Sequence, residues 1–246
     1  SIKNIMKLKV KNISKKFNSL VAVNNISFDI EKNKTLGLLG PNGCGKTTSI
    51  GMMLGLITPS SGQIFINEII LEPKSRIELL SLMNFASPYI ELPKKLTVFQ
   101  NLEVYARLYG VKEKSDRIAE LVEDLNLKKF LHKKTGELSS GQKNRVSLAK
   151  SLINKPKLLF LDEPTASLDP DVGDFVREYL EQYKNKTELT ILLASHNMKE
   201  VERLCNKIVM MKQGKIVDEG TCEELINKHG RVNLEDTFLK IARNKK

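Results

Sequence analysis

The chain has 246 residues, enough for one large domain or for a packed core with a subdomain. Lys and Arg number 40 against 29 Asp and Glu, and the net charge of +11 admits nucleic acid, anionic lipid or nucleotide as partner. The basic residues are scattered, which favours compositional bias over a dedicated polyanion surface. The three cysteines match no metal-site spacing, and no apolar run reaches the roughly 18 residues of a membrane span.

The first thirty residues predict antiparallel strands. Residues 7–17 alternate apolar and polar, and two shorter strands are expected at 21–23 and 26–30 around a turn at Asn24-Asn25. Phe17 could stack on a purine base, but position alone favours a core or sheet-edge phenylalanine.

The stretch GPNGCGKTT has the spacing of a phosphate-binding loop, between a buried strand at 35–39 and a helix at 49–54. Its glycines let backbone N–H groups line one concavity, at which the helix directs the positive end of its dipole. Lys46 can reach the β- and γ-phosphates, and the Thr47 hydroxyl can hold Mg²⁺. We therefore predict a triphosphate site formed by Gly40, Pro41, Asn42, Gly43, Cys44, Gly45, Lys46, Thr47 and Thr48.

In the middle of the chain the pattern of apolar residues changes from one typical of mixed strands and helices to one typical of helices alone. A strand at 63–66, a helix at 76–83 and a short strand at 83–86 precede a loop with two prolines at 87–93. From Thr97 to Lys155 apolar residues recur at helical spacing without a strand pattern, which predicts an inserted helical subdomain.

Two further stretches indicate anion and metal chemistry. Ser139, Ser140 and Gly141 precede a helix expected at about 143–153, and their hydroxyls and N–H groups offer a second anion site, although this signal alone is weak because many helices begin with Ser. The apolar run before Asp162 and Glu163 predicts a buried parallel strand, whose carboxyl end is where open α/β sheets bind ligands. The first acid can hold Mg²⁺, and the second can polarise the water that attacks the γ-phosphate. The alternative, an N-cap acid followed by a solvated Glu, loses weight beside a phosphate loop.

The remaining elements complete the predicted sheet. A strand at 190–194 ends at His196, at the same sheet edge, which favours a γ-phosphate contact. His132 and His229 lie in charged surroundings and are expected to be surface residues. Further elements are expected as a helix to about 183, a helix at 198–205, strands at 208–211 and 216–220 around a Gln213-Gly214 turn, and a short amphipathic stretch at 234–241.

In this order the phosphate loop, LSSGQ at 138–142, LLFLDEP at 158–164, the Ser-Leu-Asp turn and His196 resemble an ATP-binding cassette (ABC) ATPase. Ser140 stands where that family more often has Gly. The resemblance implies an α/β fold with a P-loop NTPase core, a mostly parallel sheet, an N-terminal antiparallel β subdomain and an inserted α-helical subdomain. The implied divisions are a cassette at 1–225, with core parts at about 7–86 and 156–220 and the helical insertion at about 87–155, and a short tail at 226–246.

The resemblance also implies roles for single residues. Two cassettes of this family dimerise head to tail, so that Ser139, Ser140, Gly141 and Gln142 of one close over the ATP of the other. Thr47 and Asp162 then hold Mg²⁺, Glu163 is the general base, and Asp169 links the two sites. Lys46 and His196 complete the catalytic set, and Phe17 takes the place of an adenine-stacking aromatic, which reverses the preference from position alone.

One residue expected from the resemblance is missing. The family usually has a Gln near 86–88 that joins the metal to the helical subdomain, and this sequence has none there. Counting back from Leu96-Thr97 without a gap gives Pro88, and one shift gives Ser87. Ser87 is preferred as the metal contact because only its hydroxyl could touch Mg²⁺ or the attacking water.

The resemblance favours the ATPase subunit of a transporter with a separate integral membrane permease. The segment NLEDTFLKIA at 233–242 is similar to the C-terminal segment of two-component (ABC-2 type) export cassettes. The permease is expected to bind at Tyr89–Leu102. A second identical subunit is expected as dimer partner, and no nucleic acid is expected to bind. The expected location is cytoplasmic, at the inner face of the cell membrane. The alternative is a soluble ABC ATPase in translation, repair or cofactor assembly; a small-molecule phosphotransferase would leave LSSGQ unexplained.

Overall fold

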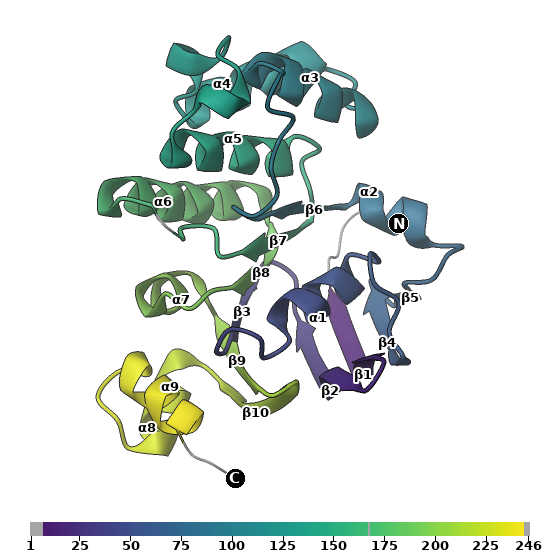
Figure 1. The fold of residues 1–246 in the computed structure, drawn as a ribbon, viewed down its shortest axis with the longest axis vertical. Helices are drawn as coiled ribbons and strands as arrows, with labels where there is room; N and C mark the ends of the chain where they lie inside the picture. Colours follow the sequence, from purple (N-terminus) through teal and green to yellow (C-terminus); the bar gives the residue numbers. More distant parts are fainter. Residues whose placement is uncertain (1–6, 167, 244–246) are drawn as a thin grey trace.

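The structure is a computed structural model that describes residues 7–166 and 168–243. The predicted ends of the cassette and tail, 1–6 and 244–246, and Ser167 of the Ser-Leu-Asp turn lie outside the described residues. The structure contains two sheets; the first lies at one side of the molecule beside α1, and the second lies between it and the remaining helices (Figure 1). The first sheet is antiparallel in the order β2-β1-β4-β5. Its strands are β1 (Leu8–Phe17), β2 (Leu20–Ile30), β4 (Ser61–Ile66) and β5 (Ile69–Ile70).

Strand β2 runs unbroken through Asn24-Asn25, so the predicted turn at this place is wrong. Asn25 has a φ of 50°, and its N–H donates to Ser14 Oγ at 2.8 Å. The pairing of β1 with β2 changes register between Val10 and Ile13 and again after it. The positive φ therefore produces a bulge in the ladder and not a reversal of the chain.

The second sheet has the order β10-β9-β3-β8-β7-β6, with β10 antiparallel and the others parallel. This confirms the mostly parallel core. Strands β3, β8 and β7 are direct neighbours, so their carboxyl ends meet at one edge. The strands are β3 (Thr35–Leu39), β6 (Met83–Ala86), β7 (Leu158–Asp162), β8 (Thr190–Ala194), β9 (Lys207–Lys212) and β10 (Lys215–Gly220).

The helices follow the predicted order with two differences. The expected helical block holds α3, α4 and α5 and no strand element among the described residues. Helix α8 was missed, although its Thr221…Glu224 capping box is a sequence signal, and α9 is longer than expected. The helices are α1 (Lys46–Met53), α2 (Arg76–Ser81), α3 (Val98–Leu108), α4 (Lys114–Asp124), α5 (Ser140–Leu152), α6 (Pro170–Thr187), α7 (Met198–Leu204), α8 (Cys222–His229) and α9 (Leu234–Arg243).

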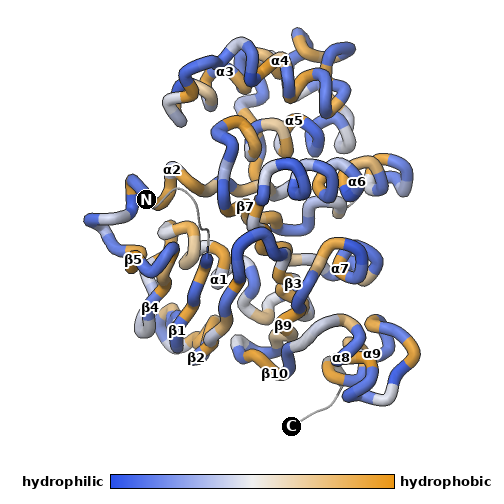
Figure 2. The backbone as a smooth tube through the Cα atoms, turned by 180° about the vertical axis from the view of Figure 1, so that it is seen from behind, coloured by the Kyte–Doolittle hydropathy of each residue, from blue (hydrophilic) through white to orange (hydrophobic). Residues whose placement is uncertain are grey.

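The parallel strands are largely buried and apolar, and the tube is mostly orange along them in Figure 2; their residues belong to three hydrophobic clusters. Along β7, Phe160 packs with the first sheet and α1, whereas Leu159 and Leu161 pack with the helices α3 to α6. Each fully buried Leu or Phe contributes about 1.5–3 kcal/mol. The helical segment thus shares its hydrophobic core with the sheet. Among residues 7–166 and 168–243, no helix combines the length and apolarity of a bilayer crossing.

Strand β10 holds the end of α8 through Asp218, which is buried. Lys228 Nζ donates to Asp218 Oδ1 at 2.6 Å, and His229 Nε2 lies 2.6 Å from Oδ2. His132 is exposed as expected, whereas the His229 side chain is half-buried and contacts Asp218. Burial acts to raise the pKa of Asp218, but the hydrogen bonds from Lys228 and His229 outweigh it and hold the pKa below its usual value.

We predict that Asp218→Asn lowers the free energy of unfolding at neutral pH, because it removes the charge that α8 contacts. A carboxylate with a lowered pKa stabilises the fold above its ordinary pKa of 3.8, and this contribution is lost as pH falls through the lowered value. The difference between wild type and variant should therefore close on acidification, as measured by urea unfolding over a pH series. Glu202→Gln, at an exposed carboxylate, is the control. A pH-independent difference would contradict the assignment.

Candidate functional site

The phosphate loop leaves β3 and enters α1 in a conformation that requires glycine at two positions. Gly45 has a φ of 108° immediately before α1, and a Cβ there would lie 2.5 Å from the carbonyl oxygen of Ala22. A Cβ on Gly40 would lie 2.5 Å from both Cys44 Sγ and the carbonyl oxygen of Met211. Side chains at either position would displace backbone, so the loop keeps its concave shape.

Lys46 is buried within this loop. Its Nζ donates to the carbonyl oxygens of Gly40 at 2.6 Å and of Pro41 at 3.3 Å. The side chain of Lys46, at the end of the loop, thereby folds back to contact the start of the loop. This places a positive charge at the N-terminus of α1, where anions bind.

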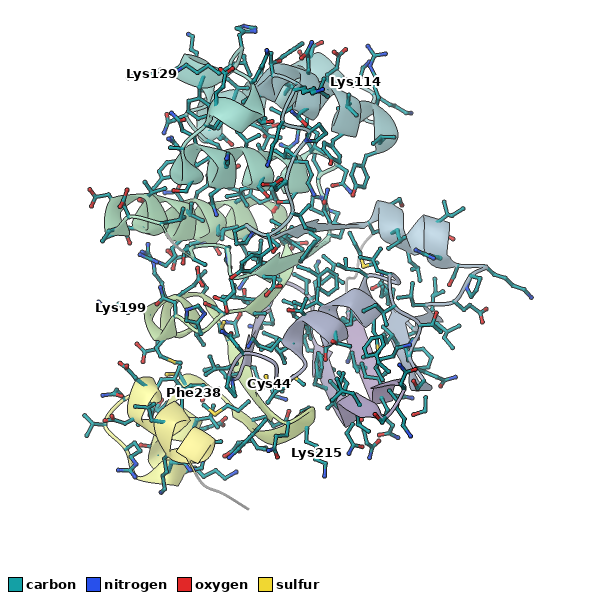
Figure 3. All side chains as sticks on the ribbon, viewed as in Figure 1. Cys44, Lys114, Lys129, Lys199, Lys215 and Phe238 are labelled. Atoms are coloured by element: carbon teal, nitrogen blue, oxygen red, sulfur yellow. The ribbon has the colours of Figure 1, made fainter. Side chains whose placement is uncertain are left out.

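A cavity of about 530 Å³ opens over the loop. Phe17 lines it, as the family resemblance implies, and is 44% exposed. Tyr89 and Gln213 also line it, although Tyr89 was expected on the permease surface and Gln213 in a turn. Cys44 is buried, and burial raises the pKa of its thiol; Figure 3 labels it close to the centre of the fold. Of the predicted loop residues, Asn42, Gly43, Gly45, Lys46, Thr47 and Thr48 line the cavity, and Gly40, Pro41 and Cys44 do not.

Two of the three side chains expected to bind metal, those of Thr47 and Asp162, lie together at this cavity. Thr47 Oγ1 donates to Asp162 Oδ2 at 3.3 Å. Burial and, after it, the neighbouring Glu163 raise the pKa of Asp162, against opposing effects of Thr47 and Lys46. A hydroxyl and a carboxylate are hard oxygen donors, and Mg²⁺ in phosphate sites commonly takes only one or two protein ligands. The pair therefore fits Mg²⁺.

Ser87 lies in a different environment. Its side chain is buried and its Oγ accepts from the N–H of Tyr89 at 3.3 Å. It lines a neighbouring groove of about 330 Å³, not the cavity that contains Thr47 and Asp162. Pro88 lines the same groove and is exposed. The structure thus brings Thr47 and Asp162 together and leaves Ser87 with its own loop.

Glu163 and His196 form a contact pair at the ends of β7 and β8. Glu163 Oε2 lies 2.8 Å from His196 Nδ1, and the Glu163 N–H donates to the carbonyl oxygen of Ala194 at 2.8 Å. Glu163 has a φ of 53°, which is uncommon for a non-glycine residue. Such strain persists where surrounding contacts fix it, and it is frequent at functional sites.

A buried glutamate on α7 joins the turns that carry this pair. Glu200 has no exposed surface and accepts from Ser195 Oγ at 2.5 Å and from Thr165 Oγ1 at 2.8 Å. Burial raises the pKa of Glu200, and the two hydroxyls oppose this effect. Since Thr165 follows Glu163 closely and Ser195 precedes His196, Glu200 sets the separation of the two turns. Sequence reasoning missed this residue.

The LSSGQ segment begins α5, away from the cavity. Ser139 Oγ accepts from the N–H of Gln142 at 3.3 Å, and Gln142 Oε1 accepts from the N–H of Ser139 at 3.0 Å. This capping box leaves Ser139 and Ser140 exposed. The described residues that line the cavity do not include Ser139, Ser140, Gly141 or Gln142. The chain therefore does not bring this segment to its own phosphate loop.

The groove beside this segment includes the first part of the expected permease surface, from Tyr89 to Lys94. It lies between the loop around Tyr89 and the first turns of α5, with Ser140, Lys143 and Asn144 on the helix side. Tyr89 is 72% and Ile90 47% exposed. An exposed apolar pair beside a groove is typical of a protein-binding surface.

Comparison with known proteins shows the family. The sequence profile of the ABC transporter family matches residues 23–166. Nod factor export ATP-binding protein I of Cupriavidus metallidurans is 35% identical over 225 residues, covering 89% of this chain and 73% of the relative. The linearmycin resistance ATP-binding protein LnrL of Bacillus subtilis is 34% identical, covering 91% and 72%. The ABC transporter ATP-binding protein NatA of Bacillus subtilis is 33% identical and covers 89% of both chains.

Solved structures share the fold. An ATP-binding subunit of an ABC transporter matches with a TM-score of 0.87 at 25% identity, over 96% of this chain and 99% of that chain. The ATP-binding cassette MJ0796, a dimer bound to ADP and Pi, matches with a TM-score of 0.79 at 24% identity, over 87% and 98%. Together with the phosphate loop and the acids at the neighbouring strand end, these matches show that the chain belongs to the ABC transporter family as an ATP-binding subunit, an ABC ATPase.

Proposed function

We propose that this ATPase hydrolyses ATP with Mg²⁺ to power export through a separate integral membrane permease. The observation that carries the proposal is the meeting of Lys46, Glu163 and His196 at the carboxyl ends of three neighbouring strands. Export is favoured by the relatives, whose names specify Nod factor export and linearmycin resistance.

The nucleotide is proposed to lie in the cavity over the phosphate loop. The loop N–H groups and the N-terminus of α1 bind the triphosphate, and Lys46 exchanges its carbonyl partners for phosphate oxygens. Phe17, at the cavity wall, stacks on the adenine. Lys15 Nζ lies 5.0 Å from the Phe17 ring centroid, within the range of a cation–π contact.

Thr47 and Asp162 are proposed to hold Mg²⁺, which when bound neutralises charge on the phosphate oxygens. Glu163 accepts a proton from the attacking water, because its carboxylate is the group at this edge not engaged by Thr47. His196 Nδ1–H can donate to Glu163; to donate to a phosphate oxygen through Nε2 at the same time, its ring carries both protons. Catalysis here is positioning and electrostatic stabilisation.

The site is proposed to be completed by a second copy of this chain in a head-to-tail dimer. Ser139 and Ser140 are exposed and lie outside their own cavity. The capping box occupies the N–H groups of Ser139 and Gln142 but not those of Ser140 and Gly141, which lie in the first turn of the helix, where anions bind. The related MJ0796 cassette has been solved as a dimer. In such a dimer each Ser139–Gln142 faces the γ-phosphate held by the partner.

The permease is proposed to dock on Tyr89–Leu102 and the groove beside it, which places the ATPase at the cytoplasmic face of the membrane. We propose the core at about 7–86 and 156–220 and the helical subdomain at about 87–155, with the docking surface on the helical subdomain.

Co-purification with the polytopic membrane protein encoded by a neighbouring gene tests the docking of a permease. If that membrane protein neither binds the ATPase nor alters its activity, the result would argue for a non-transport role.

We predict that Glu163→Gln retains ATP binding but lowers kcat roughly 10²- to 10⁴-fold, because an amide cannot accept the proton of the attacking water. The variant should accumulate as an ATP-bound dimer in size-exclusion chromatography with light scattering. Lys46→Ala is the contrasting variant and should lose ATP binding. Normal turnover by Glu163→Gln would rule out the general-base role.

We predict that Phe17→Ala raises KM for ATP about 5- to 100-fold with little change in kcat, since stacking of a base on an aromatic ring contributes about 1–3 kcal/mol. Phe17→Tyr keeps the ring and should behave as wild type. Steady-state ATPase assays measure both constants. An unchanged KM in Phe17→Ala would show that the ring only packs at the edge of the first sheet and does not stack on the adenine.

A further inference from the structure

Helix α5 is attached to the ends of two strands by side chains at opposite ends of the helix. Near its start, Asn144 Nδ2 donates to the carbonyl oxygen of Pro164 at 2.5 Å. Near its end, Lys150 Nζ donates to the carbonyl oxygen of Phe85 at 2.9 Å. The same helix carries Ser139–Gln142 at its exposed N-terminus.

The bond from Asn144 acts on the turn that contains Glu163. Pro164 is the next residue after Glu163, and Glu163 is tied on the other side to the carbonyl oxygen of Ala194. The turn is thus held between β8 and α5. Hydrogen bonds weaken steeply with distance and angle, so a displacement of α5 relative to β7 strains or breaks this contact.

The bond from Lys150 acts on the strand that leads to Ser87. Lys150 is buried, has no ion pair with any described residue, and has its Nζ 5.3 Å from the Tyr105 ring centroid. Burial lowers its pKa to about 8. An ammonium without an acidic partner is costly to bury, and its donation to Phe85, at the end of β6, offsets part of that cost.

Asn84 secures the same end of the helix. Its Nδ2 donates to Asn154 Oδ1 at 2.9 Å and to the carbonyl oxygen of Lys150 at 3.4 Å. The end of α5 is therefore fixed to β6 by main-chain and side-chain contacts. These contacts connect sheet and helical segment at the place where the sequence lacks the Gln usual in the family.

We propose that Asn144 and Lys150 are positioning residues that transmit movement of α5 to Glu163 and to the Ser87 loop of the same chain. The inference rests on the proposed head-to-tail dimer. When Ser139–Gln142 close over the ATP of the partner, α5 moves with them, and Asn144 adjusts the turn of the chain's own Glu163. Occupancy of one site thereby sets the geometry of the general base in the other, which is a coupling between sites.

The test uses the full chain with Asn144→Asp, which keeps the shape of the side chain but loses the donor. We expect kcat to fall about 10- to 100-fold, the effect of a misplaced catalytic group, with KM for ATP nearly unchanged. The Hill coefficient for ATP should fall towards one. Ser147→Ala is the matched control, because Ser147 lines the same small cavity as Asn144 and Pro164 and makes no hydrogen bond with described residues through its hydroxyl.

A second pair of variants tests the other end of the helix. Lys150→Met should lower kcat, and Lys150→Arg, which keeps a donor, should restore most of it. To rule out a merely structural role, the substitutions at Asn144 and Lys150 are also made in the Glu163→Gln variant, which serves as the parent. There, ATP-driven dimerisation should remain within about twofold of the parent, because Ser139–Gln142 are intact.

Two results would overturn the inference. One is an unchanged kcat and Hill coefficient in Asn144→Asp. The other is parallel loss of turnover and of ATP-driven dimerisation, which would mark Asn144 as a support of the fold. A Glu163→Gln parent that never dimerises with ATP would instead refute the head-to-tail arrangement itself, so the two failures are distinguishable.

Discussion

The parallel ladder of β3, β8 and β7 is the constraint from which the site follows. Ala194 pairs with Leu38 on one side and with Asp162 on the other, so the three strands end level. Their residues are buried on both faces and belong to three hydrophobic clusters, so a shift of register would disturb all three. Phosphate loop, acids and histidine come from distant parts of the chain, and the level strand ends bring them to one edge.

The turns beyond the strand ends depend on buried polar contacts. Glu163 adopts a conformation that costs of the order of 1–3 kcal/mol. The hydrogen bonds from the Glu163 N–H to Ala194 and from Asn144 to Pro164 offset this cost. Glu200 adds a bridge from Thr165 to Ser195 in a site without exposed surface. Buried networks of this kind specify one arrangement, because any partly satisfied alternative leaves a polar group without water.

Local patterns predicted the parts of the site whose chemistry is encoded within a few residues. The phosphate loop, Asp162-Glu163 and His196 follow apolar runs that are recognisable as strands, so their common edge could be foreseen. Glu200, Asn144 and Lys150 could not, since their partners lie 35, 20 and 65 residues away. The prediction of a turn at Asn24-Asn25 was wrong because a positive φ is compatible with a turn or with a bulge, and only the pairing of β1 with β2 decides between them.

Lys46 has a consequence for how tightly a nucleotide binds. Its ammonium already has two carbonyl partners, so a triphosphate gains only the difference between phosphate and carbonyl contacts. The same contacts hold Lys46 against the loop, so little ordering entropy is lost when the lysine turns to a phosphate. Such an exchange favours fast release as much as capture, which suits an enzyme that must discard its product in every cycle.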